Sequence, residues 1–194
     1  MPITHTNRQG VTYYLCQGTT KGGRPRYYFS RERRDTSPNA VPNGYVVTES
    51  VNGVVSLCRA QEATFHPDEV AAVRNALEAH PQPGNYRVAV KKDHIEVYER
   101  VGIGGDDLVR EFVKEGFVPF GGIKAVLAER ERRARFAAIL RFGLVDTNRR
   151  FFTVDRMTFR GDERWLMVGG PRRLATLLKE VIPKLGTEAF FELF

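Results

Sequence analysis

Short runs of apolar, aromatic and β-branched residues alternate with polar turns through the first sixty residues. These runs predict strands over residues 11–17, 26–30, 45–50 and 54–59. The Gly-rich segment between the first two strands and the Asn52-Gly53 pair between the last two predict hairpin turns. We therefore expect a small four-stranded sheet. A sheet of this size is marginally stable alone and needs a covering element.

The next apolar pattern has helical spacing. Val70, Val73 and Leu77 predict one face of a helix over residues 67–79, and Pro67 suits its first position. We expect this helix to cover the small sheet. The following PQPG segment, residues 81–84, disfavours regular structure and predicts a boundary. The expected domains are therefore residues 1–80 and residues 84–194.

The remaining chain carries a second set of patterns. They predict strands over residues 86–90, 94–101, 136–145, 151–159 and 164–168, and helices near residues 106–115, 122–135 and 171–180. Strands and helices are segregated, which favours the α+β class. We expect a small basic antiparallel β-module followed by a larger α+β domain. The apolar C-terminal residues are expected to pack on their own domain, or else on another subunit or protein: Phe190, Phe191, Leu193 and Phe194.

Composition narrows the class of protein. The chain has 194 residues, of which 42% are hydrophobic, enough to form a packed core. It shows no apolar run long enough to span a membrane and no signal-peptide pattern at its start. Its two cysteines, Cys16 and Cys58, are too few for a disulfide scaffold, so we expect a reducing, cytoplasmic environment and two buried structural thiols.

Positive charge is concentrated at the N-terminal end. The formal net charge is +7, and +5 of it lies in residues 1–60. This excess predicts attraction to polyanions. Seven of the eight basic side chains there are arginines, which suit phosphate geometry well. The eight are Arg8, Lys21, Arg24, Arg26, Arg31, Arg33, Arg34 and Arg59. The alternative is a solvated basic surface without a partner.

Aromatic and basic residues interleave in the strand over residues 26–30. Strand alternation places Tyr28 beside Arg26 on one face, and Tyr27 and Phe29 on the other face, which is the expected core. An exposed tyrosine among arginines is typical of surfaces that stack bases and bind phosphates. The candidate nucleic-acid-binding residues are Arg8, Lys21, Arg24, Arg26, Tyr28, Arg31, Arg33 and Arg34. Tyrosines and arginines also occur on ordinary half-buried sheets, so this alternative stays open.

Residues 4–30, THTNRQGVTYYLCQGTTKGGRPRYYFS, resemble the opening of an uncharacterised family of prokaryotic proteins. The resemblance extends to the PNGY turn at residues 42–45 and to the FFELF ending. It implies a folded N-terminal module. It implies no activity and assigns no site residue.

A second candidate anion site lies near residue 170. The segment Gly169-Gly170-Pro171-Arg172-Arg173 is expected to open a helix, where the helix dipole disfavours cations. A bound phosphate would offset that effect, so Arg172 and Arg173 are candidate anion-binding residues. An internal salt bridge would have the same effect and remains the alternative.

Catalytic signals are weak. No phosphate-binding loop, nucleophile elbow or zinc-protease motif is present, and we expect no metal and no cofactor. The densest titratable cluster is Asp93, His94 and Glu96 on a predicted hairpin. With Asp155 it would suit a metal-dependent nuclease. A solvated hairpin is the simpler interpretation.

These observations leave three hypotheses. The first is a non-enzymatic nucleic-acid-binding protein, with RNA or single-stranded DNA favoured because its basic sheet carries aromatic residues. The second is an interaction or adaptor protein. Its basic module would bind an acidic protein surface, and its C-terminal domain would bind a protein partner or a second copy of itself. The third is the nuclease-like enzyme. None of the three requires a membrane.

Overall fold

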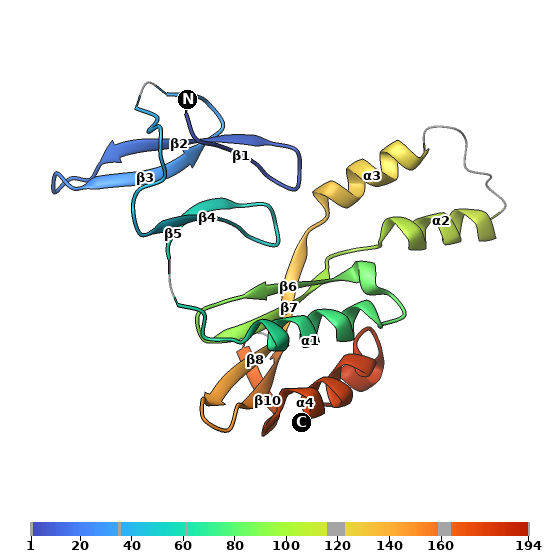
Figure 1. The fold of residues 1–194 in the computed structure, drawn as a ribbon. Coiled ribbons are helices and arrows are strands. Elements are labelled where there is room, and N and C mark those ends of the chain that lie inside the picture. The colour runs from blue at the N-terminus through green and yellow to red at the C-terminus, as the bar shows by residue number, and fades with distance from the viewer. Residues whose placement is uncertain (1, 35, 61, 116–122, 159–163, 194) are drawn as a thin grey trace. The chain divides into compact units, whose positions relative to one another are not determined.

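The protein is α+β, as the element pattern predicts. The computed structural model describes residues 2–34, 36–60, 62–115, 123–158 and 164–193. Its strands form three antiparallel sheets (Figure 1). The chain divides into two compact units, Met1–Glu62 with Gly105–Ala134, and Ala63–Gly104 with Arg135–Phe194. We call them the N-terminal unit and the sheet unit.

The described part of the N-terminal unit contains two small sheets and two helices. Strands β1 (Thr4–Thr6), β2 (Thr12–Thr19) and β3 (Pro25–Ser30) form one sheet in that order. Strands β4 (Tyr45–Glu49) and β5 (Val55–Arg59) form a separate hairpin. Helices α2 (Gly105–Lys114) and α3 (Ile123–Arg133) belong to the same unit.

The expectation of one four-stranded sheet is wrong, because other segments occupy the free edge of β2. The short polar strand β1, which the pattern did not predict, pairs with the first half of β2. The Gln17 amide then donates to the Thr36 carbonyl at 3.1 Å, so the loop after β3 covers the second half. The β4–β5 hairpin instead lies against β3 through side chains, with the rings of Tyr27 and Tyr45 6.3 Å apart.

Polar contacts join the two small sheets. Asn7, which is buried, donates to the Gly53 carbonyl at 2.7 Å, and its side-chain oxygen accepts from the amides of Gln9 and Val11. The Glu49 carboxylate lies 2.8 Å from His5 Nε2 and accepts from the Arg8 amide. The β1–β2 turn is therefore fastened to the β4–β5 hairpin by hydrogen bonds.

The sheet unit is built on a five-stranded antiparallel meander. Its strands are β6 (Tyr86–Val90), β7 (His94–Arg100), β8 (Phe136–Asp146), β9 (Phe151–Thr158) and β10 (Arg164–Arg173), in the order β10-β9-β8-β7-β6. Helices α1 (Pro67–Glu78) and α4 (Leu174–Val181) pack with its buried side chains in one hydrophobic core. Three short 3-10 turns complete the unit, at Pro83–Asn85, Ile182–Lys184 and Glu188–Phe190.

Helix α1 forms at the predicted place but does not cover the small N-terminal sheet. Its apolar residues Val73 and Leu77 are buried in one cluster with Ile95, Phe142 and Leu177 of the sheet unit. The large sheet offers a continuous apolar face, whereas the small sheets offer few buried apolar side chains. The boundary between the two units therefore falls before α1, at residues 62–63, and the PQPG segment lies inside the sheet unit.

Strand β10 extends further than predicted, and the last helix begins later. Arg172 and Arg173 pair with Phe152 and Phe151 of β9, so they lie in the strand, and α4 starts at Leu174. Gly170 permits this close pairing. It has φ +121°, and an added Cβ would lie 2.6 Å from the Phe152 carbonyl oxygen.

The C-terminal residues pack on their own domain, as predicted. Phe190 and Leu193 are buried in the core of the sheet unit, while Phe191 is exposed, and Phe194 lies outside the described residues. The Arg156 guanidinium, itself buried, donates to the carbonyls of Phe191 and Leu193. The tail is thus held by both apolar burial and hydrogen bonds.

Candidate nucleic-acid interface

Exposed cations line the β2–β3 hairpin and the loop that follows it. Six of the predicted residues are exposed there: Lys21, Arg24, Arg26, Arg31, Arg33 and Arg34. Within the described ranges, none of the six forms an ion pair with a carboxylate. We call these six residues the basic segment. Their charges are available to an external anion.

Tyr28 lies beside two of these cations. It is opposite Cys16 in the β2–β3 register, next to the pair of Gly18 and Arg26, so all four share one face. The Arg34 guanidinium lies 5.9 Å from the centre of the Tyr28 ring. A Cβ added at Gly18 would lie 3.5 Å from the ring edge. Gly18 therefore leaves this edge of the ring uncovered on its β2 side.

Strand alternation predicts that Tyr27 and Phe29 are buried and Tyr28 is exposed, but the two faces of β3 differ less than this. Tyr27, Tyr28 and Phe29 are all half-buried. Each face of the sheet has one fully buried residue on β2, Leu15 on the Tyr27 face and Cys16 on the Tyr28 face. Tyr28 is thus a partly exposed ring set into a packed face.

A second aromatic–cation pair lies on the opposite face of the sheet. The Arg31 guanidinium is 5.9 Å from the centre of the Tyr13 ring. Tyr13 was not among the site residues predicted from the sequence. Its position opposite His5, on the strand face of Leu15, emerges only from the β1–β2 and β2–β3 pairing.

Arg8 does not belong to the basic segment. It lies in the β1–β2 turn, is half-buried, and its guanidinium donates to the Ala134 carbonyl at the end of α3. Its amide donates to Glu49 at 2.8 Å. Arg8 is therefore committed to contacts within the N-terminal unit, because the turn points its side chain toward α3 rather than toward solvent.

The candidate anion site at Arg172 and Arg173 has internal partners. The Arg172 guanidinium forms an ion pair with Glu180, two turns along the adjoining helix. The Arg173 guanidinium lies 5.6 Å from the centre of the Phe151 ring. Arg172 therefore forms the internal salt bridge that was the alternative to a bound phosphate.

The titratable hairpin cluster is a hydrogen-bonded chain. His94 Nδ1 lies 2.6 Å from Asp93 Oδ1, and His94 Nε2 lies 2.9 Å from Glu96 Oε1. The Tyr98 hydroxyl donates to the other Glu96 oxygen at 2.6 Å. Burial, followed by this hydrogen bond to Glu96, raises the pKa of Tyr98 well above its ordinary value. Tyr98 is thus a neutral donor in this chain at physiological pH.

Asp155 does not join this cluster. It accepts from Arg141 Nε at 2.7 Å, and the same guanidinium lies 4.6 Å from the centre of the Trp165 ring. Arg141 was missed in the sequence, although it interrupts the apolar run of β8. Its partners on β9 and β10 become visible only from the strand register.

No group of three histidine, cysteine or acidic side chains within the described residues could hold a metal ion. Both cysteines are free thiols. Cys16 is buried, as expected, but Cys58 is exposed, so the expectation of two buried thiols is wrong for Cys58. Cys58 lies on a two-stranded hairpin opposite Val46, and both residues are exposed, as is Ser56 on the same strand face.

In comparisons with known proteins, no family model, no curated protein and no solved structure matches this chain. Among the described residues, no helix is long and apolar enough to cross a lipid bilayer. Function is therefore inferred from the residues and their geometry alone.

Proposed function

We propose that the N-terminal unit binds RNA or single-stranded DNA through the basic segment and Tyr28. The observation that carries the proposal is the set of six exposed cations without a described acidic partner, spread over one hairpin and its following loop. Cations that are paired with carboxylates inside the fold attract a phosphate backbone only weakly. Among the described residues, no carboxylate pairs with these six, which leaves their charge for it.

The position of Tyr28 favours single strands over duplex. A base can stack on a partly exposed ring only when the base is not already stacked and paired inside a duplex. The Arg34 guanidinium beside the ring offers a second flat surface and a charge for the adjacent phosphate. In helix α3, Arg132 and Arg133 already pair with Glu129, so these two cations are less available to read a duplex groove than those of the basic segment.

The test is fluorescence anisotropy of the full chain with a labelled 20-nucleotide oligouridylate, a matched DNA strand and a matched duplex, across a salt series. If about five phosphates are engaged, the log–log salt slope on single strands is near −3.5, at roughly 0.7 per contact. Arg33→Ala with Arg34→Ala flattens the slope by about 1.4. Tyr28→Ala weakens binding by about 1–3 kcal/mol and leaves the slope nearly unchanged, because stacking releases no counterions.

Arg132→Ala with Arg133→Ala is the matched control. It removes the same two charges from the same unit, but these arginines pair with Glu129. We expect its slope to stay close to that of the parent chain. Equal slopes for the two double variants would mean that only net charge matters. An absence of salt-dependent binding to any of the three nucleic acids overturns the proposal and favours a protein partner for the basic segment.

A further inference from the structure

At the β6 edge of the five-stranded sheet, the backbone groups of Val88 and Val90 have no partner strand among the described residues. The Lys91 amide donates to the His94 carbonyl at 2.9 Å, and bonded pairs alternate along an antiparallel ladder. The register of β6 and β7 therefore turns Arg87 and Ala89 inward, toward β7. The amide and carbonyl groups of Val88 and Val90 point outward, and no described strand pairs with them.

The two edges of this sheet differ. Edge strand β10 has two register shifts, contains Pro171 and leads directly into α4. Such irregularities protect an edge from pairing with another strand. Edge strand β6 pairs in unbroken register over Tyr86–Val90 and has neither a proline nor a bulge, and Val90 is 47% exposed. A regular, partly apolar edge of this kind is suited to accept a further strand.

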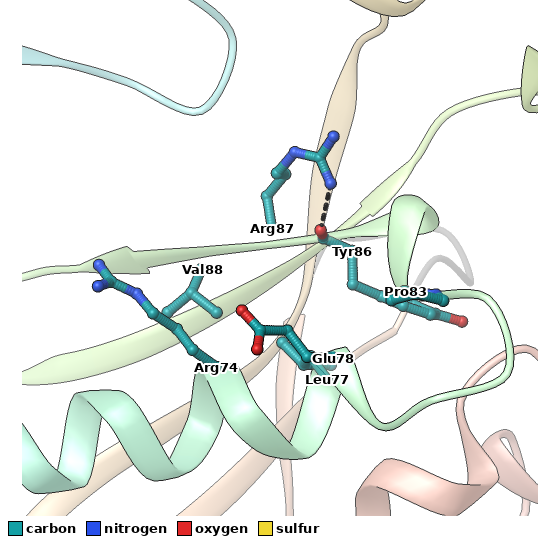
Figure 2. Close-up of a pocket in the computed structure, with 7 residues that line it drawn as sticks. All are labelled: Arg74, Leu77, Glu78, Pro83, Tyr86, Arg87 and Val88. Atoms are coloured by element: carbon teal, nitrogen blue, oxygen red, sulfur yellow. Dashed lines mark hydrogen bonds between the residues drawn. The ribbon is translucent and has the colours of Figure 1, made fainter.

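A groove runs along this edge between β6 and α1 (Figure 2). It is lined by Arg74, Leu77 and Glu78 of α1, Pro83, and Tyr86, Arg87 and Val88 at the edge. Figure 2 shows Arg74 and Glu78 pointing from the helix toward the strand, while the Arg87 guanidinium lies across β6 and bonds the Tyr86 carbonyl. The groove therefore has an apolar floor and one charge of each sign on its helical wall.

These two charges are one helical turn apart and are self-complementary. Arg74 and Glu78 are both exposed, and neither forms an ion pair with a described residue. A two-fold axis normal to the sheet at Val88 pairs two β6 strands antiparallel and sets two α1 helices side by side in opposite directions. Arg74, Glu78 and Val88 line the same groove. Because the two-fold axis at Val88 reverses the helix direction, each Arg74 then faces the Glu78 of the other copy.

We propose that β6 is a homodimer interface, in which a second copy of this chain adds its own β6 and continues the sheet. The pairing is isologous, with Val88 opposite Val88 and Tyr86 opposite Val90 of the second copy, whose amide shares the Tyr86 carbonyl with the Arg87 guanidinium. Helices that neighbour each other on one face of a sheet pack about 8–10 Å apart, within reach of paired Arg and Glu side chains. A second copy satisfies the outward backbone groups and both wall charges at once.

The test is sedimentation equilibrium of the full chain from low to high micromolar concentration. We expect the mass to rise from that of one chain to that of two. Arg74→Glu places four carboxylates at the two-fold axis and raises the dissociation constant at least 10-fold. The charge swap Arg74→Glu with Glu78→Arg restores the reciprocal pairs and returns the constant to within about 3-fold of the parent value.

Two further variants keep the test decisive. Val90→Pro removes an outward amide without touching the β6–β7 ladder, and it raises the dissociation constant while the Trp165 fluorescence stays native. Lys179→Glu changes an exposed cation on α4 by the same charge and leaves the constant unchanged. The interface is overturned if the parent chain stays monomeric, if Arg74→Glu dimerises as the parent does, or if the charge swap fails to restore dimerisation.

Discussion

The two units of this protein are stabilised by different means. In the sheet unit, apolar side chains from two helices and from strands of the sheet form one continuous buried cluster. In the described part of the N-terminal unit, the buried apolar side chains are only Leu15, Cys16 and Val55. There, buried Asn7 and the Glu49 carboxylate connect the two small sheets.

This difference explains where the exposed arginines lie. A large core draws the arginines of the sheet unit into internal contacts, as with Arg141, Arg150 and Arg156. A unit of two small sheets has too little interior for this, so its hairpin arginines stay in solvent. The sparse core and the exposed charge of the N-terminal unit are thus two results of the same small size.

The largest expected effect is the loss of a core ring from the sheet unit. Phe142→Ala removes a fully buried side chain and lowers the free energy of unfolding by about 3–5 kcal/mol. Urea unfolding followed by the fluorescence of the single tryptophan, Trp165, measures it. Val145→Ala on the same strand is the control. Val145 is 55% exposed, so its substitution changes the free energy of unfolding by less than about 0.5 kcal/mol. Equal effects of the two variants would contradict the assigned core.

A smaller effect is expected from the polar link of the N-terminal unit. Asn7→Ala leaves the Gly53 carbonyl and the Gln9 and Val11 amides without their partner, which costs about 2–4 kcal/mol. Cys16 is the reporter, because its buried thiol reacts only when this unit opens, and a Cys58→Ser background removes the exposed thiol.

The control for this variant is Thr6→Ala, which removes only an exposed hydroxyl pair with Thr12. We expect Cys16 to react much faster in Asn7→Ala and at nearly the parent rate in Thr6→Ala. Unchanged protection in Asn7→Ala would show that the apolar contacts of this unit suffice without the polar link.

The smallest expected effect is a pH-dependent contribution of the Glu69 carboxylate to the free energy of unfolding. Glu69, at the start of α1, accepts from Arg150 Nε at 2.8 Å and from the His66 amide at 2.9 Å. Burial raises the pKa of Glu69, but these hydrogen bonds outweigh it and hold the pKa below its ordinary value. The ionised carboxylate therefore stabilises the fold at neutral pH, and this contribution is lost as the pH falls through the lowered pKa.

Glu69→Gln should cost about 1 kcal/mol at pH 7 and progressively less as the pH falls through the lowered pKa of Glu69, where the parent carboxyl becomes neutral as well. The measurement is urea unfolding by Trp165 fluorescence at a series of pH values from 7 downward. Asp68→Asn, an exposed neighbour in the same turn, should retain most of the pH dependence of the parent chain. A constant difference between Glu69→Gln and the parent across this range would contradict the role of the ion pair.

Local chemistry predicted most elements of the fold. The β6–β7 hairpin, α1 and the apolar tail formed where alternation, helical spacing and Pro67 predicted them, because each signal acts within a few residues. The short strand β1 was missed since its three residues, Thr4–Thr6, are polar and give no apolar pattern. The exposure of the basic segment was also predictable, as loops rich in arginine rarely bury their charges.

The sequence by itself determined the class of the fold, the place of most of its strands and helices, and the location of its excess positive charge. The tertiary structure decided that α1 packs on the large sheet, that Arg8 and Arg172 are bound internally, and that Arg34 lies beside Tyr28. These outcomes depend on pairings between segments far apart in the chain. The type of a side chain determines the kind of partner that it binds, apolar surface for an apolar helix face and an acceptor or a ring for a guanidinium. Which of these partners lies within contact distance depends on the folded chain.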